Sequence, residues 1–349
     1  MKKIKAAVIG STGYAGQDLT RLLMQHPFVD LTHLSSKSYE SKEYASVYAN
    51  FKGFSDIVCS DGNIENIADK VDVIFVALPH GLASSMITKE VLAKTKVIDL
   101  GADFRLKDLG IYKNWYQSEH DNKECLDVAV YGLCELHREE IKTAHLVANP
   151  GCYTTCSILS LAPLLAEGLI EEDSIIIDAK SGVSGAGRTL GLGVHFNECN
   201  ESMKAYKIAS HRHTPEIEQE LGLVCNKEIT LSFTPHLIPV NRGILATCYA
   251  KLIKKLSYNN VLSVYEKYYA NEHFIRLTKE GISPETRWVK GSNFVDIGFT
   301  IDERTGRIVV VGAIDNLVKG AAGQAVQNMN IMFNFPETSG INQIPMFPI

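Results

Sequence analysis

Short apolar runs alternate with helical patterns along the first part of the chain. The runs are residues 3–9, 31–36, 71–78, 97–100 and 145–148, and small or polar residues follow each of them. After the first run, Leu19, Leu22 and Leu23 recur at helical spacing. This alternation predicts a parallel sheet with right-handed crossovers. Ligands bind such sheets at the carboxyl ends of the strands.

The pattern changes after residue 166. Longer runs with more apolar–polar alternation follow, at residues 174–179, 230–234, 244–252, 294–301 and 307–314. Such alternation predicts a mixed or antiparallel sheet in a second domain. Residues 316–333 predict a helix with a face of small residues, and we expect it to pack against the first domain.

Composition and charge limit the class of protein. The chain has 349 residues, enough for two domains, with 45% hydrophobic and 21% charged residues. A net charge of −5 argues against nucleic acid as a partner, because phosphate-binding surfaces carry a basic excess. The first apolar run is too short for a signal peptide, and no run reaches about 18 residues. We therefore expect a cytoplasmic protein without a membrane partner.

A glycine-rich loop follows the first apolar run. It reads Gly10-Ser11-Thr12-Gly13-Tyr14-Ala15-Gly16 and precedes the first helical pattern. Glycines let the backbone approach a pyrophosphate, and the start of a helix supplies amides and a positive dipole end. The loop is therefore a candidate dinucleotide site, and a tight turn that needs glycine for its own geometry is the alternative.

The end of the second strand bears on which dinucleotide is bound. An acid that recognises the ribose is expected there, about 20 residues beyond the loop. The chain has Ser35-Ser36-Lys37 instead. Hydroxyls and a lysine suit a 2′-phosphate that a carboxylate would repel, so the sequence favours NADP(H) over NAD. A solvated loop lysine is the alternative.

Cys152 is the candidate nucleophile among eight cysteines, none of which forms a CxxC pair. It follows Asn149-Pro150-Gly151 and precedes a helical run. The Pro-Gly turn places Cys152 at the start of that helix, which stabilises a thiolate and supplies amides for an oxyanion. A buried structural cysteine is the alternative. Cys156, one turn on, is a packing residue or a resolving thiol.

Two histidines supply the expected partner of the thiol. The segment reads His211-Arg212-His213-Thr214-Pro215-Glu216. A thiol nucleophile needs a base and later an acid, and histidine serves as both near neutral pH. His213 is preferred because Glu216 could hold its ring. A metal site is one alternative, without a further ligand cluster to support it. A helix capped by Thr214, with Pro215 first in the helix, is another.

Two further groups are candidates for contact with phosphate or cofactor. A second glycine-rich loop, residues 181–188, contains Ser184 and Gly185 after a predicted strand. Its backbone could approach a ligand, and a flexible turn is the alternative. Arg105 follows a strand end and could bind a phosphate bidentately, with a surface ion pair as the alternative. Arg242 is a further candidate of the same kind.

These motifs together resemble the N-acetyl-gamma-glutamyl-phosphate reductase family of arginine biosynthesis and, more distantly, the aspartate-semialdehyde dehydrogenases. The resemblance covers nearly the whole chain. The matching segments are residues 10–16, 77–81, 99–105, 149–153, 181–188, 211–216 and 315–316.

The resemblance implies an α/β fold with two domains. A Rossmann-type parallel-sheet domain of residues 1–150, which binds NADP, would be completed by a C-terminal helix at 316–349. An α+β catalytic and dimerisation domain with a mixed sheet would span residues 151–315. The long strands of this domain suit a homodimer or homotetramer.

The resemblance also implies roles for single residues. Cys152 would be the nucleophile and His213 the acid and base, with Glu216 beside it. Asn316 would lie near the nicotinamide, and Arg105 and Asn149 near the substrate phosphate. The chain departs from the family pattern at two positions near the nucleophile, which are Thr154 and Cys156.

The implied reaction is the reduction of a small-molecule acyl phosphate through a Cys152 thioester. The substrate would be N-acetyl-gamma-glutamyl phosphate and the product N-acetylglutamate 5-semialdehyde. One alternative is a related reductase that acts on aspartyl phosphate or on a carrier-bound aminoadipyl phosphate. Another is a dinucleotide-binding redox sensor that uses Cys152 and Cys156.

Overall fold

The computed structural model describes residues 2–348, which form two compact units. The first unit holds the residues up to Pro150 together with Ala321–Asn342, and the second holds Gly151–Gly320 together with the residues from Gln343 onward. The C-terminal residues depart from the predicted boundary, because they pack with the second unit. There the Met346 amide donates to the Lys290 carbonyl at 3.0 Å.

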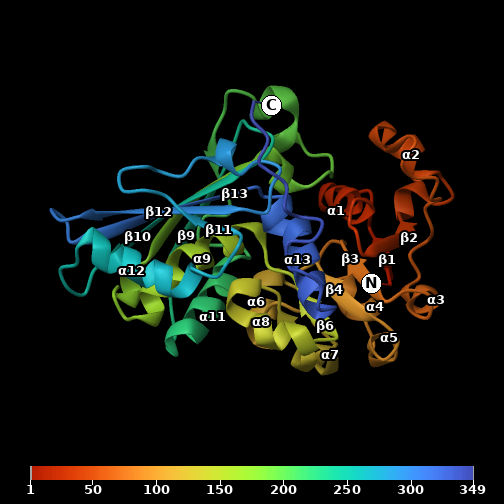
Figure 1. The fold of residues 1–349 in the computed structure, drawn as a ribbon, viewed down its shortest axis with the longest axis horizontal. Coiled ribbons are helices and arrows are strands. Elements are labelled where there is room, and N and C mark those ends of the chain that lie inside the picture. The colour runs from red at the N-terminus through yellow and green to blue at the C-terminus, as the bar shows by residue number, and fades with distance from the viewer. Residues whose placement is uncertain (1, 349) are drawn as a thin grey trace. The chain divides into compact units, whose positions relative to one another are not determined.

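A parallel sheet forms the centre of the first unit (Figure 1). Its strand order among residues 2–348 is β2-β1-β3-β4-β6-β5. The strands are β1 (Ile4–Ile9), β2 (Val29–Ser35), β3 (Val73–Val76), β4 (Lys96–Asp99), β5 (Val130–Tyr131) and β6 (Leu146–Ala148). Because β2 and β3 flank β1 on opposite sides, the topological switch point lies between β1 and β3.

Helices bury both faces of this sheet. Helix α13 (Gly323–Met332) packs with α1 (Tyr14–Met24), α8 (Cys134–Thr143) and β4, while α3 (Ile64–Ala68) and α5 (Lys89–Leu92) cover a core that includes Ile74 and Val76. Burial on both faces explains why the strands read as continuous apolar runs. The remaining helices are α2 (Tyr44–Val47), α4 (Ala83–Met86), α6 (Leu109–Tyr116), α7 (Lys123–Val128) and the short 3₁₀ turns Lys37–Tyr39 and Ala49–Phe51.

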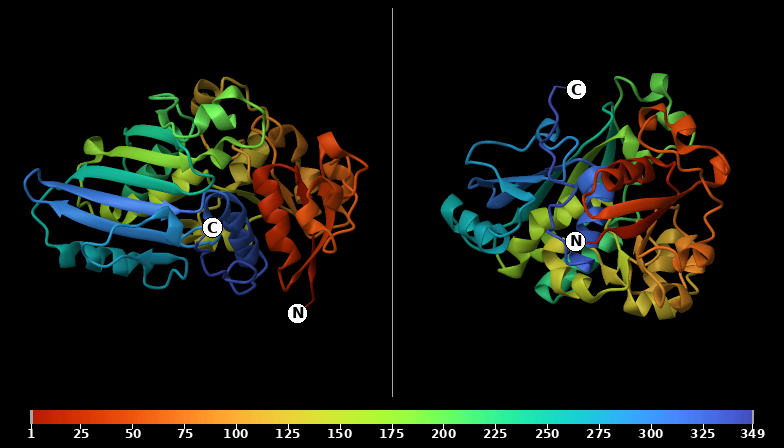
Figure 2. Two further views of the ribbon diagram at one scale, coloured as in Figure 1. Left: turned by 90° about the horizontal axis from the view of Figure 1, so that it is seen from above. Right: turned by 45° about the vertical axis from the view of Figure 1, so that its right-hand side comes forward.

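A mixed sheet forms the centre of the second unit, and Figure 2 shows its strands side by side. Its order within the described chain is β11-β12-β13-β10-β7-β9-β8. The pairs β7–β9 and β11–β12 are parallel, and the other neighbours are antiparallel. The strands are β7 (Ile176–Gly182), β8 (Lys204–Ala205), β9 (Ser232–Ile238), β10 (Ile244–Lys251), β11 (Ile275–Leu277), β12 (Val295–Asp302) and β13 (Arg307–Ile314).

Helices lie against one face of this sheet (Figure 1). Helix α9 (Cys152–Ala166) packs on β10 and β13, and α11 (Thr214–Cys225) and α12 (Tyr258–Tyr269) pack against α9. A Cβ added to Gly312 of β13 would lie 2.9 Å from Cys156 Sγ, so glycine permits this close contact. The other short elements are α10 (Phe196–Cys199) and the 3₁₀ turns Glu172–Ser174, Val183–Ala186, Leu192–Val194 and Thr286–Trp288.

The predicted helix at 316–333 begins later than expected and in a different form. A π-helix (Val318–Ala322) precedes α13. The Asp315 carboxylate accepts hydrogen bonds from the amides of Leu317 and Val318 at 2.8 and 3.1 Å, which starts the turn. A Cβ added to Gly320 would lie 2.7 Å from Cys152 Cβ, so the wide turn passes directly over the start of α9.

No helix among residues 2–348 is long and apolar enough to cross a lipid bilayer.

Candidate active site

Cys152 is the first residue of α9, as the Pro-Gly turn predicts. Gly151 is the N-cap and has an extended backbone. The Cys152 side chain is half-buried, whereas most of the helix that follows is buried. The thiol therefore lies beside the first amides of α9, where the helix dipole favours negative charge.

Glu216 brings a buried carboxylate to the same place. It lies in the first turn of α11 and is 0% exposed. Its Oε1 atom accepts hydrogen bonds from the Gly151 amide at 2.9 Å and from the Thr154 hydroxyl at 3.0 Å. The contact between Glu216 and the His213 ring stays a prediction. The structure shows that Glu216 binds the start of the helix that Cys152 begins.

His211 and His213 form an edge-to-face pair, with ring centroids 4.7 Å apart. The His213 amide donates to His211 Nδ1 at 3.1 Å. Burial, followed by the nearby His213, lowers the pKa of His211 to about 2, so His211 stays neutral at working pH. His213 is half-buried and is the candidate that remains for proton transfer.

The alternative in which Thr214 caps the helix does not hold. His213 is the N-cap of α11, Thr214 is the first helical residue and Pro215 is the second. The helix therefore begins one residue earlier than the capping pattern predicts, and this places His213 itself at the helix start.

Two tyrosines that the sequence analysis did not select lie beside Cys152. Tyr206 donates its hydroxyl proton to the Tyr153 hydroxyl at 3.2 Å, and Tyr153 donates to the His236 carbonyl at 3.2 Å. Burial raises the pKa of both phenols, and the Cys152 charge adds to the rise. Adjacency to Cys152 could have indicated Tyr153, but no sequence signal indicated Tyr206.

Cys156 is poorly suited to act as a resolving thiol. It is 0% exposed, and its sulfur packs against Gly312. Burial raises the pKa of its thiol to about 12, so very little thiolate exists near neutral pH. Every cysteine in the described residues is a free thiol.

The first glycine loop of the other unit lies after β1, at the switch point. Gly10 has a φ of +80°, and an added Cβ would lie 2.4 Å from the Ala77 carbonyl oxygen. A Cβ on Gly16 would lie 2.3 Å from the Gly10 carbonyl oxygen, so internal packing requires both glycines. A Cβ on Gly13 would meet its nearest described atom at 3.7 Å. Gly13 therefore leaves space beside the start of α1, which fits a pyrophosphate.

The side chains around this loop tie it to the end of β2. Thr12 and Ser36 share a hydroxyl hydrogen bond of 2.7 Å, and Gly10 donates its amide to the Ser35 hydroxyl at 3.4 Å. Ser35 and Ser36 are each only 3% exposed, whereas Lys37 is exposed. The two serines thus hold the loop in place, and Lys37 is the residue of this group that faces solvent. Tyr14 and Ala15 begin α1, and Tyr14 is 39% exposed.

Arg105 and Asn149 lie at the carboxyl ends of β4 and β6. Arg105 donates from Nε to the Asn149 carbonyl and from Nη2 to the Leu100 carbonyl, both at 2.8 Å. The Asn149 amide group donates to the Ala321 carbonyl at 3.1 Å and accepts from Asn328 at 3.0 Å. These bonds fix the guanidinium and use the polar atoms of the Asn149 side chain.

Asn316 holds the second glycine loop within its own unit. Its side chain donates to the Ser184 hydroxyl at 2.9 Å and accepts from the Gly243 amide at 2.7 Å. Gly185 lies in the same turn, where an added Cβ would lie 2.8 Å from the Ser181 hydroxyl. Arg242 pairs with the buried Asp315 at 3.5 Å. The loop is therefore braced, which contrasts with the flexible turn considered above.

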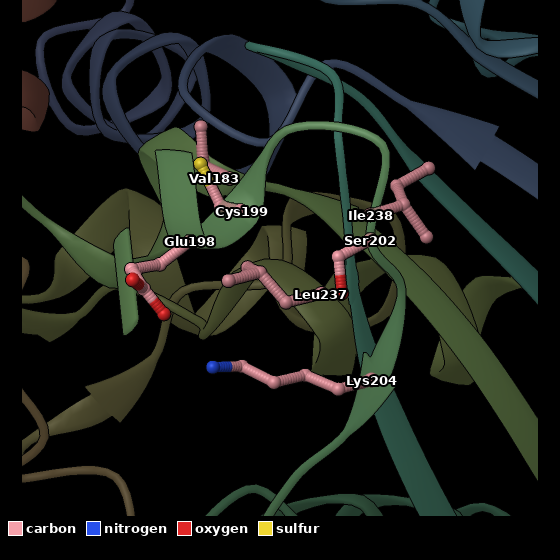
Figure 3. Close-up of a pocket in the computed structure, with 7 residues that line it drawn as sticks. All are labelled: Val183, Glu198, Cys199, Ser202, Lys204, Leu237 and Ile238. Atoms are coloured by element: carbon pink, nitrogen blue, oxygen red, sulfur yellow. The ribbon is translucent and has the colours of Figure 1, made fainter. Parts of the chain in front are cut away.

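A small cavity lies beside this loop (Figure 3). Its volume of about 10 Å³ leaves room for about one water molecule. It is therefore too small for a substrate. Its lining residues are Val183, Glu198, Cys199, Ser202, Lys204, Leu237 and Ile238.

Within residues 2–348 no group of three His, Cys, Asp or Glu side chains is arranged to hold a metal ion.

Curated proteins from several bacteria are similar to this chain over nearly its full length. N-acetyl-gamma-glutamyl-phosphate reductase of Lachnoclostridium phytofermentans is 56% identical, with 99% of this chain and 100% of the relative covered. The reductases of the same name from Lachnospira eligens and Campylobacter jejuni subsp. doylei are 54% and 52% identical, over 99% and 97% of this chain and 100% and 98% of the relatives.

The chain belongs to the N-acetyl-gamma-glutamyl-phosphate reductase family. This confirms the predicted family and class of enzyme, an oxidoreductase.

Two family models match this reductase, each over a different part of the chain. The model described as "Semialdehyde dehydrogenase, NAD binding domain" matches residues 5–144, and the model described as "Semialdehyde dehydrogenase, dimerisation domain" matches residues 152–316. A nicotinamide dinucleotide cofactor is thereby supported.

Solved structures show the same fold. Aspartate semialdehyde dehydrogenase II of Vibrio cholerae, complexed with ASA, has a TM-score of 0.70 at 18% identity, with 96% of this chain and 99% of that chain covered. The Candida albicans aspartate semialdehyde dehydrogenase with NADP has a TM-score of 0.71 at 17% identity, with 95% and 99% covered. These likenesses confirm the predicted fold class.

The space beside Gly13 yields a prediction about NADPH binding. Gly13→Ala should leave the fold stable but weaken NADPH binding about tenfold or more, because its methyl group fills the space assigned to the pyrophosphate. Gly16→Ala is the matched comparison and should lower the free energy of unfolding by about 1–3 kcal/mol through overpacking. Fluorescence titration with NADPH and urea unfolding would measure the two effects. Unchanged NADPH affinity in Gly13→Ala would contradict the assignment.

Asp99 yields a prediction of pH dependence. It is 0% exposed at the end of β4, and burial, followed by the Asp103 charge, raises its pKa from 3.8 to about 7. The folded protein thus keeps this proton to higher pH than the unfolded chain does. Its contribution to stability is greatest below about pH 4 and is lost as the pH rises through about 7.

Asp99→Asn removes this titration and keeps an oxygen that can accept from the Gly101 amide, the partner of Asp99 Oδ1. The fall in melting temperature between pH 5 and pH 8 should therefore be smaller in the variant than in the wild type. Thermal melts at four pH values would test this. Parallel curves would show that Asp99 does not titrate in this range.

Proposed function

We propose that this protein reduces N-acetyl-gamma-glutamyl phosphate to N-acetylglutamate 5-semialdehyde and phosphate, as a step of arginine biosynthesis. The observation that carries the proposal is the pairing of two helix starts. Cys152 begins α9, His213 is the N-cap of α11, and the Glu216 carboxylate from α11 binds the start of α9. The names of the full-length relatives support the choice of substrate.

The first step uses Cys152 as a nucleophile. Its thiolate attacks the acyl carbon, the C–S bond forms, and phosphate leaves with the electrons of the C–O bond. The acyl group remains as a thioester, which divides one difficult reaction into two easier ones. Amides in the first turn of α9 stabilise the oxyanion, a type of contact typically worth about 3–4 kcal/mol.

The second step returns the enzyme to its starting state. When bound, the nicotinamide dinucleotide supplies the hydride that reduces the thioester. His213 donates a proton to the resulting oxygen and takes it back as the aldehyde forms and Cys152 leaves as a thiolate. His211, which stays neutral, orients the backbone of His213 through its Nδ1 atom.

Arg105 is the proposed ligand of the substrate phosphate. Its guanidinium is fixed by two backbone carbonyls at the strand ends, so little rotamer entropy remains to be lost on binding. Asn149 supports Arg105 through its carbonyl, while its own amide bonds within the first unit. We assign Asn149 to positioning near the phosphate.

NADP(H) is the proposed form of the cofactor, bound by the first unit. Gly10, Gly13 and Gly16 shape the loop, and the chain has no carboxylate at positions 35–37, where one would recognise an unphosphorylated ribose. Lys37 is the exposed cation there. Ser184, Gly185 and Asn316 of the second unit are proposed to contact the nicotinamide end.

The second unit is the proposed catalytic and dimerisation domain. Helices cover one face of its sheet. Buried residues alternate with half-exposed ones along β9 and β10, so the half-exposed side chains share the other face. We propose this half-exposed face as the surface through which a homodimer forms, alone or within a homotetramer. The free thiols agree with a place in the reducing cytosol.

The reverse reaction tests the proposed function. Purified enzyme with N-acetylglutamate 5-semialdehyde, NADP and phosphate should produce NADPH, and omission of phosphate should abolish it. Cys152→Ser should bind NADPH normally and lose more than nine-tenths of the rate. Aspartate semialdehyde in a parallel reaction shows which substrate is used. Turnover of that aldehyde alone would keep the chemistry but change the substrate, and a Cys152→Ser variant with more than a tenth of the rate would exclude the thioester.

Lys37 provides the test of cofactor choice. Lys37→Ala removes the exposed cation, so KM for NADPH should rise about tenfold while KM for NADH stays unchanged. Steady-state kinetics with both cofactors would measure the two constants. Lys42→Ala, at another exposed lysine after β2, is a suitable control. Equal effects on NADPH and NADH would contradict a contact with the 2′-phosphate.

A further inference from the structure

The start of α9 is capped by a residue of another helix. Gly151 is the N-cap of α9 and has no side chain to offer, and Thr154 is the third helical residue. In a capping box, a glutamate at this third position accepts a hydrogen bond from the N-cap amide of its own helix. In α9 the position holds Thr154, and the carboxylate that accepts from the Gly151 amide is that of Glu216 in α11.

The start of α11 explains why Glu216 can do this. Glu216 is itself the third helical residue of α11, so the N-cap amide of His213 would be its ordinary target. That amide donates to His211 Nδ1 at 3.1 Å instead. The α11 N-cap is thereby satisfied, and the Glu216 carboxylate bonds to α9.

We propose that Glu216 is a positioning residue that holds the Cys152 helix start against the His213 helix start, and that Thr154 assists it. The inference rests on the proposed function, in which Cys152 and His213 act on the same acyl group. It assigns Glu216 no contact with substrate. Thr154 contributes through its hydroxyl, which lies 3.0 Å from Glu216 Oε1 and 2.5 Å from the Gly151 carbonyl oxygen.

The position of Glu216 helps to place Cys152, but the charge of Glu216 acts against the Cys152 thiolate. A carboxylate at the amino ends of two helices is stabilised by both dipoles. The same negative charge is bound to the amide of Gly151, the residue before Cys152, and therefore opposes ionisation of the thiol. We therefore expect Glu216 to favour the geometry of the reaction, while its charge disfavours the Cys152 thiolate. The two effects are separable by experiment.

The other titratable groups around the site should not cause a difference in Cys152 ionisation between the variants. Burial keeps Tyr153, Tyr206 and Cys156 protonated, and His211 stays neutral. The charged and titratable groups that remain are the same in all the variants below. They include His213, Lys207 and Arg212 beside His211, and Lys319 in the π-helix whose Gly320 lies against Cys152. Asp315 with its partner Arg242, and His236 beside Tyr153, are also among them.

Glu216→Gln and Glu216→Ala separate charge from position. Glutamine keeps an oxygen for the Gly151 amide and removes the charge. The pH midpoint of Cys152 alkylation by iodoacetamide should therefore fall by about half a unit or more, while kcat stays within about tenfold of the wild type. Alanine removes both the charge and the acceptor. The alkylation midpoint should again be lower than in the wild type, and kcat should drop about a hundredfold or more while NADPH binding is retained.

Thr154→Val and Thr155→Val form a matched pair if Glu216→Ala does not fold. Both lose a buried hydroxyl that bonds to the Gly151 carbonyl, at 2.5 and 3.1 Å, but only that of Thr154 bonds to Glu216 among the described residues. Thr154→Val should lower kcat about threefold to tenfold, Thr154→Ser should restore it, and Thr155→Val should leave it unchanged. The alkylation midpoint should not fall in any of the three.

Two results would overturn the inference. One is an alkylation midpoint in Glu216→Gln that is unchanged or higher than in the wild type. The other is a kcat in Thr154→Val that equals that of Thr155→Val. Alkylation needs no substrate, so it reports on Glu216 even where the wild type fails to reduce the acetylated substrate. Failure of the proposed function and failure of this inference are thus distinguishable.

Discussion

The Glu216 carboxylate bonds to the first amide of α9 while its own backbone belongs to the first turn of α11. Cys152, the proposed nucleophile, begins α9, and His213, the proposed acid and base, is the N-cap of α11. We propose that this bridge sets their separation. Helix α9 is in turn held on the sheet by close packing, since Gly312 of β13 allows the Cys156 sulfur to approach the strand. The mixed sheet, the helix and the bridge therefore form one support for Cys152.

Much of this support follows from local sequence rules. Apolar runs and glycine turns predicted the main strands of both sheets, and Pro150-Gly151 predicted the start of α9 at Cys152. These features depend on residues close in sequence, whose effects simple periodicity and turn chemistry describe. The short strands β5, β8 and β11 were missed, because two or three residues carry too little pattern to predict a strand.

The contacts that complete the site join residues far apart in sequence. The bond between Gly151 and Glu216 spans 65 positions, and that between Ser184 and Asn316 spans 132. No local pattern encodes such pairs, so the Glu216 bridge and the Tyr153–Tyr206 pair could not be derived from the chain alone. The prediction for Glu216 identified the residue but not its helix partner. The prediction for the helix at 316–333 failed at its start, where a π-helix stands whose Gly320 lies against Cys152, a residue far away in the sequence.

The chain passes between its two units three times, after Pro150, after Gly320 and after Asn342. Helix α13, which packs on α1, α8 and β4 of the first unit, follows the whole of residues 151–320 in the chain. During synthesis on the ribosome, the N-terminal parallel sheet therefore waits for α13 until nearly all of the protein has been made. Cutting the chain at any single bond therefore cannot separate the two units into complete fragments.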